Sequence, residues 1–434
     1  MKLKALTCVL CAAGLLGGAQ AATDADVEKS FFPYKNGVPT VAGLTPGTVI
    51  DKSNVDQFKA ALIPSMAQFI RNGQTTLTVG ETYSFSISRN YIDATRANLS
   101  KAALGASVGD LTGFIAGRPF PQEPDAKDAR AGEKVFWNFQ HNNRIGDSYT
   151  IWPWYMDYKN MASGKTERSL KQEYHIIQWK HRVDQEPRPE VSPNPAQLLR
   201  SGYLKVHEPQ DLKDTQLLIS RFSDDAKLDE VYLYLGFQRR VRRLASNQVT
   251  DPFLGSDLMV EDFEGYNGRM RDMKWEYKGT VNLLVPFYAH NKQKLAEERK
   301  EADGFKFIDF GGEGECFPNV TWQLRKTYVI DSVPVDPNHV ISRRTHYVDA
   351  ETYALSLNEI YDRKGELWKT FIVAYTDSEN HLPKNAGRGV AINDGFSITD
   401  VQAKHCTTGS FKVHLEQDMS PTRLFSVQNM RGSN

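Results

Sequence analysis

Residues 229–244 read D-E-V-Y-L-Y-L-G-F-Q-R-R-V-R-R-L. Apolar side chains stand at alternate positions, with Leu233, Leu235 and Phe237 on the same side, which is the two-residue period of a strand with one buried face. A straight strand of this length would extend over roughly 50 Å. We therefore expect one long strand that belongs to a large and strongly curved sheet.

The rest of the chain supports a sheet-rich fold. Segments with alternating apolar residues follow one another from residue 149 onward, and short turn signals separate many of them, which favours antiparallel hairpins. Long helices do not alternate with these segments, as they would in a doubly wound fold. The predicted strands are residues 149–158, 170–182, 203–206, 216–222, 229–244, 269–278, 282–288, 321–333, 339–348, 352–361, 366–375, 396–401 and 411–416. The predicted fold class is α+β, mostly β: one large, curved antiparallel sheet with a few helices on its concave side.

The N-terminus has the pattern of a secretory signal peptide. Lys2 and Lys4 precede an apolar run, and residues 19–21 (A-Q-A) fit a signal-peptidase site. This run is too short to span a membrane, and no later run reaches the roughly 18 apolar residues that a spanning helix needs. We therefore expect a signal peptide (residues 1–21), an N-terminal extension with amphipathic helices (22–145) and a sheet domain (146–434) that packs with the extension as one unit.

Within the extension, residues 55–70 predict an amphipathic helix that covers the sheet and bends at Pro64. Further along, the charged run K-Q-K-L-A-E-E-R-K at residues 292–300 predicts an exposed helix. The 53 basic and 53 acidic side chains balance, so the composition suggests neither a nucleic-acid partner nor a strongly charged surface.

Two cysteines, Cys316 and Cys406, remain after the signal peptide. In an oxidising compartment a disulfide is the default expectation for such a pair. It would close a loop of about 90 residues and stabilise the fold by roughly 4 kcal/mol. His405 beside Cys406 is compatible with metal or nucleophile chemistry, but one neighbour is outweighed by the disulfide interpretation.

The connection at residues 252–266 predicts a loop with a short helix that folds over the sheet as a lid. The strands carry more apolar side chains than a few short helices can cover. An incomplete barrel around an apolar cavity would use this surplus, and so would a densely packed core. The predicted wall and lid of the cavity are Leu233, Leu235, Phe237, Leu258, Met259, Phe263, Trp275 and Tyr277.

Arginines and acids around this connection supply nearly matched charge. We expect a salt-bridge network that holds the lid to the sheet, with an anion or partner site as the alternative. Its predicted members are Arg240, Arg242, Asp257, Glu261 and Asp262.

Several motifs carry a family resemblance. They are R-R-V-R-R-L (239–244) with G-S-D-L-M-V-E-D-F-E-G-Y (255–266), A-G-R-P-F-P (116–121) with K-V-F-W-N-F-Q (134–140), W-E-Y-K-G-T-V-N-L-L-V-P-F-Y (275–288), and R-R-T-H-Y-V-D-A-E-T-Y (343–353) with I-Y-D-R-K-G-E-L-W-K (360–369). Taken together along the chain, these motifs resemble a secreted proteobacterial family of unknown function that is described as outer-membrane-lipoprotein-sorting-like and related to LolA and LolB.

The resemblance implies an incomplete antiparallel barrel wrapped around helices, with a hydrophobic cavity suited to lipids or acyl chains. It also implies a periplasmic shuttle that works with an inner-membrane exporter of the resistance-nodulation-division (RND) type and an outer-membrane protein. This chain is much longer than LolA or LolB, by roughly 140 residues before the repeated strands, so the ligand stays open.

Enzyme motifs are missing from the sequence. It contains no H-E-x-x-H metal-ligand spacing and no G-x-S-x-G elbow, and its glycine-rich runs at 311–314 and 387–389 do not lie in βαβ units. We therefore expect no catalytic residue, no metal site and no cofactor. The predicted function is a periplasmic carrier of a lipid or other hydrophobic molecule. The alternatives are a non-catalytic envelope adaptor or sensor that binds only protein partners, and a hydrolase with a dispersed site.

Overall fold

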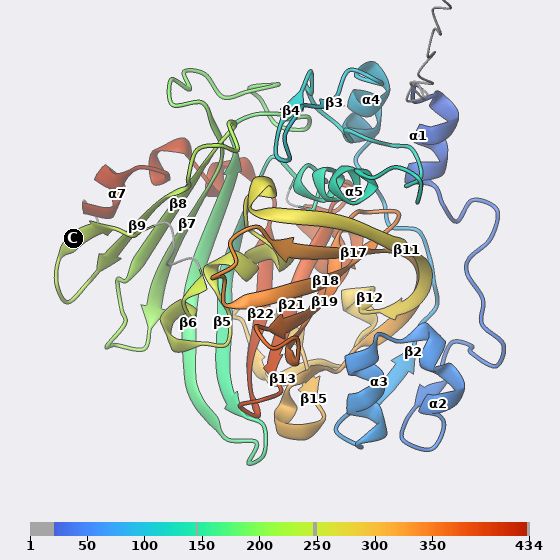
Figure 1. Ribbon diagram of the computed structural model, residues 1–434. Coiled ribbons are helices and arrows are strands. Elements are labelled where there is room, and N and C mark those ends of the chain that lie inside the picture. Colours follow the sequence, from blue (N-terminus) through green and yellow to red (C-terminus); the bar gives the residue numbers. More distant parts are fainter. Residues whose placement is uncertain (1–20, 145, 246–249, 432–434) are drawn as a thin grey trace, which may run out of the picture.

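The computed structural model describes residues 21–144, 146–245 and 250–431 (Figure 1). The predicted signal peptide lies outside these residues except for Ala21. Most of the strands in the described chain belong to one large, mixed sheet that does not close into a barrel. Its strand order from edge to edge is β1, β2, β17, β18, β19, β20, β21, β22, β5, β6, β7, β8, β9, β10, and two further strands branch from it, β11 on β17 and β12 on β20.

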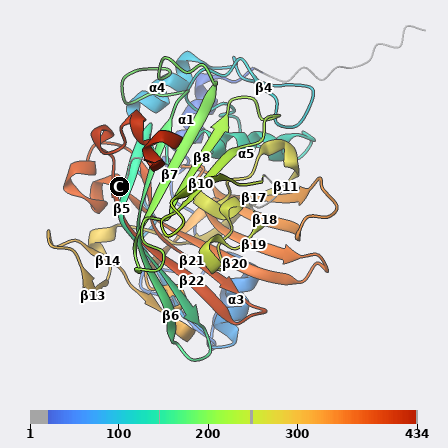
Figure 2. The same ribbon diagram turned by 90° about the vertical axis from the view of Figure 1, so that its left-hand side faces the viewer.

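The sheet is antiparallel except where β2 pairs with β17 and β12 with β20. Figures 1 and 2 show β5–β8 running at a steep angle to β17 and β18, as the curvature of the sheet requires. Its strands are β1 (Val49–Ile50), β2 (Leu77–Val79), β5 (Ser148–Asn160), β6 (Thr166–Gln178), β7 (Leu198–Glu208), β8 (Gln216–Phe222), β9 (Glu230–Leu235), β10 (Arg240–Arg243), β11 (Met273–Val285), β12 (Phe287–Tyr288), β17 (Thr321–Pro334), β18 (Ile341–Asp349), β19 (Leu355–Asp362), β20 (Leu367–Asp377), β21 (Ala391–Asp400) and β22 (His405–His414).

The prediction of a mostly β fold with one large, curved sheet is confirmed. The prediction of a single long strand at residues 229–244 is wrong, because the chain turns back after Leu235 and β9 pairs with β10. Gly236 and Arg239, whose φ of +49° lies in the left-handed region, belong to this turn. The stretch forms a hairpin at one edge of the sheet and not its centre.

Both faces of the central strands are covered, which explains why these strands are apolar on both sides. We call the face that carries Trp154, Phe371, Phe396 and Phe411 the inner face. The outer face is covered by the hairpin β13 (Leu295–Lys300) and β14 (Lys306–Ile308) and by the short pair β15 (Phe310–Gly311) and β16 (Phe317–Pro318). The charged run at 292–300 thus contributes an exposed strand, where a helix was predicted.

The helices lie on both faces, where the sequence predicted them on the concave side alone. Residues 55–70 form two short helices, α2 (Val55–Phe58) and α3 (Pro64–Arg71), because Pro64 starts the second helix at its first position instead of bending one long helix. α3 lies on the outer face, where Ser65 N donates to Glu359 at 2.7 Å. α5 (Ala131–Gln140) packs on β11 and β17.

The remaining elements are short and lie at the periphery. α1 (Asp24–Phe31) and α4 (Arg89–Ala97) pack together near the hairpin of β3 (Ala103–Leu104) and β4 (Leu111–Thr112), as Figure 1 shows. At the other end of the sheet, α7 (Val427–Arg431) lies against β10. α6 (Ser378–His381) follows β20 directly.

Candidate functional site

Residues 252–266, predicted as a lid, lie on the inner face, and we call them the inner segment. They form two short 3₁₀ turns, Phe253–Gly255 and Val260–Gly265, in place of the predicted short helix. Figure 1 shows the segment crossing in front of the middle of the sheet. Phe263 packs edge-to-face on Phe253, with ring centroids 5.1 Å apart, and on Trp154 and Tyr174 at 6.2 and 6.0 Å.

A small cavity remains beside Phe263, with a volume of about 20 Å³. This space holds about one water molecule. The large open hollow that one interpretation of the sequence predicted is therefore filled by the inner segment in this conformation. We call the space the aromatic cavity; its lining residues are Ile151, Trp154, Tyr174, Leu258, Asp262, Phe263, Glu264, Phe371, Asn393, Phe396 and Phe411.

A buried ion pair fixes the inner segment to β18. Arg344 donates to Glu261 at 2.9 Å and to Asp262 at 3.1 Å, and all three side chains are buried. Burial alone would raise the pKa of Glu261, but the charges of Arg344 and His339 outweigh it and lower the pKa to about 2. Burial raises the pKa of Asp262, which shares the same guanidinium.

A second group of contacts fixes Asp257 at the start of the segment. Its carboxylate lies 2.7 Å from the His405 ring nitrogen and accepts from Thr407 at 2.7 Å, both on β22. Lys369 on β20 donates to its carbonyl oxygen. The hydrogen bond to Asp257 raises the pKa of His405, so the imidazole gains a proton more readily than a free histidine does.

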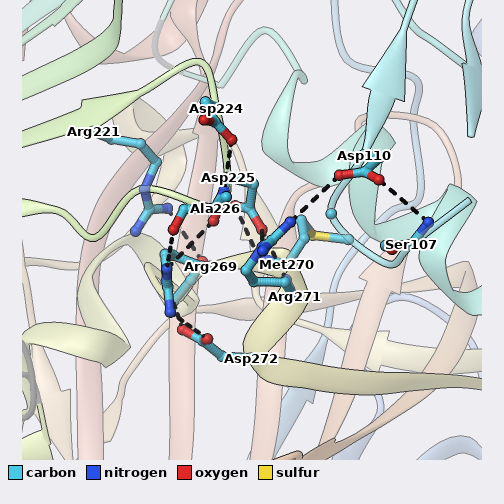
Figure 3. Close-up of polar contacts among 12 residues, drawn as sticks. Ser107, Asp110, Arg221, Asp224, Asp225, Ala226, Arg269, Met270, Arg271 and Asp272 are labelled. Atoms are coloured by element: carbon cyan, nitrogen blue, oxygen red, sulfur yellow. Dashed lines mark hydrogen bonds and ion pairs between the residues drawn. The ribbon is translucent and has the colours of Figure 1, made fainter. Parts of the chain in front are cut away.

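The chain that follows the inner segment is held by a polar network (Figure 3). Arg269 forms two bonds to Asp272 at 2.8 and 2.6 Å, and Asp225 accepts from the backbone of Met270 and Arg271. Arg271 also reaches Asp110 at 3.4 Å, which ties this network to the N-terminal part of the chain. These contacts anchor residues 269–272 to Asp225 and Asp110, which lie outside the inner segment.

The residues predicted to line the cavity differ in their burial and location. Leu258, Met259 and Phe263 are buried in the inner segment within the main core, and Leu233 packs against the same core from β9. Leu235 is half-buried. Phe237 does not line the cavity, because it lies in the turn between β9 and β10 with 73% of its surface exposed.

Trp275 and Tyr277 belong to a different core from the aromatic cavity. Trp275 stacks on Phe136 of α5 with ring centroids 3.8 Å apart, and Tyr277 packs at the edge of this cluster. The prediction that they share one cavity with Phe263 is therefore wrong. Residues 269–278 and 282–288 were predicted as separate strands, but most of them form the single strand β11, which places Trp275 beside α5.

The charged network exists with a different cation. Asp257, Glu261 and Asp262 lie in it as predicted, but Arg240 and Arg242 are exposed on the edge strand β10 and Arg242 bonds to Gln238. Arg344 takes their place. The signal for it was available in R-R-T-H-Y-V, since an arginine inside an otherwise alternating strand pattern needs a buried acidic partner.

A second small cavity adjoins the aromatic cavity and shares Tyr174 and Glu264 with it. Its volume is about 20 Å³. We call it the arginine pocket, because three buried arginines, Arg144, Arg200 and Arg221, line it. The sequence did not predict this pocket, since its members come from the turn after α5, from β6, β7 and β8, and from the end of the inner segment and the residues just after it.

A buried cluster of two histidines and an aspartate, His290, His381 and Asp394, has the close ligand spacing of a metal site. His290 Nδ1 lies 2.8 Å from Asp394, and His381 Nδ1 lies 3.3 Å from the other carboxylate oxygen. The backbone N–H of Val413 donates to His381 Nε2 at 2.9 Å. The neutral His381 ring therefore carries its proton on Nδ1, the nitrogen that a metal would need, although His381 Nδ1 and Asp394 Oδ1 form no hydrogen bond of good geometry within the described residues.

The predicted disulfide is confirmed. Cys316 and Cys406 are bonded, with Cα atoms 5.9 Å apart, and join the segment before β16 to β22 on the outer face. Within the part of the chain that the structure describes, no helix combines the length and the apolar character needed to cross a bilayer.

Comparison with known proteins identifies the family. The family described as "Protein of unknown function (DUF1329)" matches residues 49–431. The uncharacterized protein PA3922 of Pseudomonas aeruginosa is 24% identical over 348 residues, covering 78% of this chain and 70% of that protein. Two solved structures are similar. A putative outer membrane lipoprotein-sorting protein domain from Vibrio parahaemolyticus has 17% identity and a TM-score of 0.47, and the match covers 70% of this chain and 100% of that one. The LolA superfamily protein NE2245 from Nitrosomonas europaea has 10% identity and a TM-score of 0.39, and the match covers 69% of this chain and 98% of that one. The match over residues 49–431 confirms the resemblance that the motifs indicated: the chain belongs to the DUF1329 family.

Proposed function

We propose that this protein is a non-catalytic periplasmic carrier for a lipid or another hydrophobic molecule. The observation that carries the proposal is the inner segment. It covers the apolar inner face of an open sheet with Leu258, Met259 and Phe263, yet polar contacts at Asp257 and at Glu261 and Asp262 hold it in place. A hydrophobic ligand would bind to the same face when these contacts open.

The energies of the two states are comparable. Removing the three apolar side chains of the inner segment from the core costs about 1.5–3 kcal/mol each. A ten-carbon chain on the exposed inner face would gain on the order of 8 kcal/mol before ordering costs. A ligand of this size can therefore offset the apolar part of the displacement of the segment, and the protein is expected to be closed when no ligand is bound.

The family resemblance of the sequence motifs supports a proposal about partners. We propose that the protein exchanges its ligand with an RND-type exporter in the inner membrane and with an outer-membrane protein. Removal of the protein in the cell would then change the distribution of the ligand between the two membranes.

Mass spectrometry of an organic extract from native protein, purified from the periplasm, tests the carrier proposal. We expect a hydrophobic molecule at near-stoichiometric amount. Phe396→Ser changes the cavity wall on β21 and should reduce that amount, while Phe237→Ser, the same change at an exposed position, should not. Circular dichroism confirms that both variants are folded. Native protein that carries no such molecule and binds no decanol in calorimetric titration would contradict the proposal.

One observation favours a second function, a non-catalytic envelope adaptor that binds only proteins. The aromatic cavity has a volume of only about 20 Å³, so the inner face already has the density of an ordinary core. An adaptor of this kind would contain no lipid in any variant, and the same extraction experiment separates it from the carrier.

A further inference from the structure

The arginine pocket contains buried donors that the fold leaves unused. The side chain of Arg144 is 2% exposed, and its Nη1 donates to Phe139 O at 2.7 Å and Asn142 Oδ1 at 2.8 Å. Its Nε and Nη2 find no hydrogen-bond partner among the described residues. A buried guanidinium with free donors costs free energy unless an acceptor binds there.

Positive charge exceeds negative charge around the pocket. Arg221 forms a bidentate pair with Asp229 at 2.6 and 3.0 Å, and Arg200 donates to the neutral Asn267 at 2.8 Å. The acid nearest to Arg144 is Glu264, whose carboxylate lies 3.9 Å from the Arg144 Nε. The pocket lining thus holds three arginines and one carboxylate, Glu264, while Asp229 pairs with Arg221 from outside the lining. Burial, with Arg221 and Arg144 nearby, lowers the pKa of Arg200 to about 9, as expected where cations outnumber anions.

Two consecutive residues of the inner segment occupy the two adjoining cavities. The Phe263 ring lies in the aromatic cavity, and the Glu264 carboxylate lines both cavities and accepts from the Tyr149 hydroxyl. Glu264 has φ +60° and ψ +23°, a left-handed conformation that is unfavourable for a residue other than glycine. The closed protein therefore maintains a strained backbone at Glu264. This backbone places the Glu264 carboxylate beside the arginines and the Phe263 ring in the aromatic cavity.

We propose that Phe263 and Glu264 occupy the place of an amphipathic ligand whose acid group binds in the arginine pocket and whose hydrocarbon chain lies in the aromatic cavity. The inference rests on the proposed carrier function and narrows its ligand class to anionic amphiphiles. A carboxylate and a phosphate monoester share the chemistry that the guanidinium groups recognise. On binding, the acid group replaces Glu264 and accepts the unused donors of Arg144, and the left-handed turn relaxes.

Calorimetric titration of the full-length mature protein with three ten-carbon probes tests the inference. The probes are decanoate, decyl phosphate and decanol, which differ only in the head group. We expect each acid to bind about tenfold or more tightly than the alcohol. The stronger of the two acids identifies the natural head group as a carboxylate or a phosphate.

Three variants test which side chains cause the preference for acids. Glu264→Gln removes the competing charge and should raise affinity for the acids by about tenfold while leaving decanol binding within about twofold. Arg200→Met should abolish the preference for acids. Arg240→Met removes an arginine from the exposed strand β10 and should leave every affinity unchanged. Thermal unfolding shows whether the variants are folded, and the comparison of head groups on the wild-type protein requires no variant.

The possible outcomes separate the inference from the proposed function. Equal affinity of the wild-type protein for acid and alcohol overturns the inference and leaves the carrier proposal standing. Binding of none of the probes overturns both. A preference for acids that Glu264→Gln does not increase overturns the assignment of Glu264 as the group that the ligand replaces.

Discussion

At the scale of single residues, Arg344 is the cation on which the closed inner segment depends. It is 1% exposed and lies between Glu261 and Asp262, which are also buried. Arg344→Met would remove the guanidinium that both buried carboxylates share and leave Glu261 only His339, 3.5 Å away, which costs about 3–5 kcal/mol of unfolding free energy. Urea unfolding followed by circular dichroism measures this loss. Arg240→Met, on an exposed strand, should change stability by less than about 0.5 kcal/mol.

The comparison of Arg344→Met with Arg240→Met can contradict this role of Arg344. If the two arginine variants lost equal stability, the ion pair would contribute no more than a surface arginine. The inner segment would then be held by its apolar side chains and by the contacts of Asp257.

His405 makes the attachment of the inner segment depend on pH. Its pKa is raised above the usual 6.5 by the hydrogen bond to Asp257, so its stabilisation is complete below about pH 6.5 and is lost as the pH rises through the folded value. Glu167, 3.6 Å away, adds to the effect. We expect the melting temperature of the wild-type protein to exceed that of His405→Gln at about pH 6, and the difference to shrink as the pH rises further above 6.5. A difference that stays constant over this range would contradict the role of His405.

At the scale of elements, the inner segment behaves as part of the core. Phe263 is 3% exposed and contacts aromatic rings from β5, β6 and its own segment. Phe263→Ala should therefore cost about 3–5 kcal/mol in urea unfolding and enlarge the aromatic cavity. Added decanol should then raise the melting temperature of the variant, because it binds only the folded state. Phe237→Ala is the matched control at an exposed position, and equal losses for both phenylalanines would contradict the packing described here.

The alternation of apolar residues located most strands of the sheet but not where the chain turns. The two-residue period runs through residues 229–237, yet Gly236 and Arg239 turn the chain into a hairpin. The charged run at 292–300 forms β13 because it pairs with β14, a tertiary contact that overrides the local preference for a helix. The bend predicted at Pro64 is a helix start instead, since a proline fits the first position of a helix as readily as it bends one.

The candidate site was predictable only in part, for a reason of distance along the chain. Leu258, Met259, Phe263, Glu261 and Asp262 lie in one stretch whose composition marked it. Their partners are scattered over sequence separations of 80 residues or more: Arg344 lies 83 residues from Glu261 and His405 lies 148 from Asp257. Strand order decides which of several arginines faces an acid, and periodicity contains no information on strand order. Proximity in sequence therefore predicted Arg240 and Arg242 as the partners of these acids, and it gave no reason to predict Arg344.

At the scale of the whole molecule, the disulfide ties the outer layer to the sheet. Cys316 and Cys406 are 90 residues apart and close a loop that contains β17–β21. In the chain-entropy treatment, a loop of this length stabilises the folded state by roughly 4–5 kcal/mol. Reduction should therefore lower the urea midpoint of the wild-type protein, and Cys316→Ala with Cys406→Ala should show a similar midpoint with or without reductant. Thiol titration of the unreduced, denatured mature protein should find no free thiol. Two free thiols, or a midpoint that reductant does not change, would show that the outer layer is held to the sheet by packing alone.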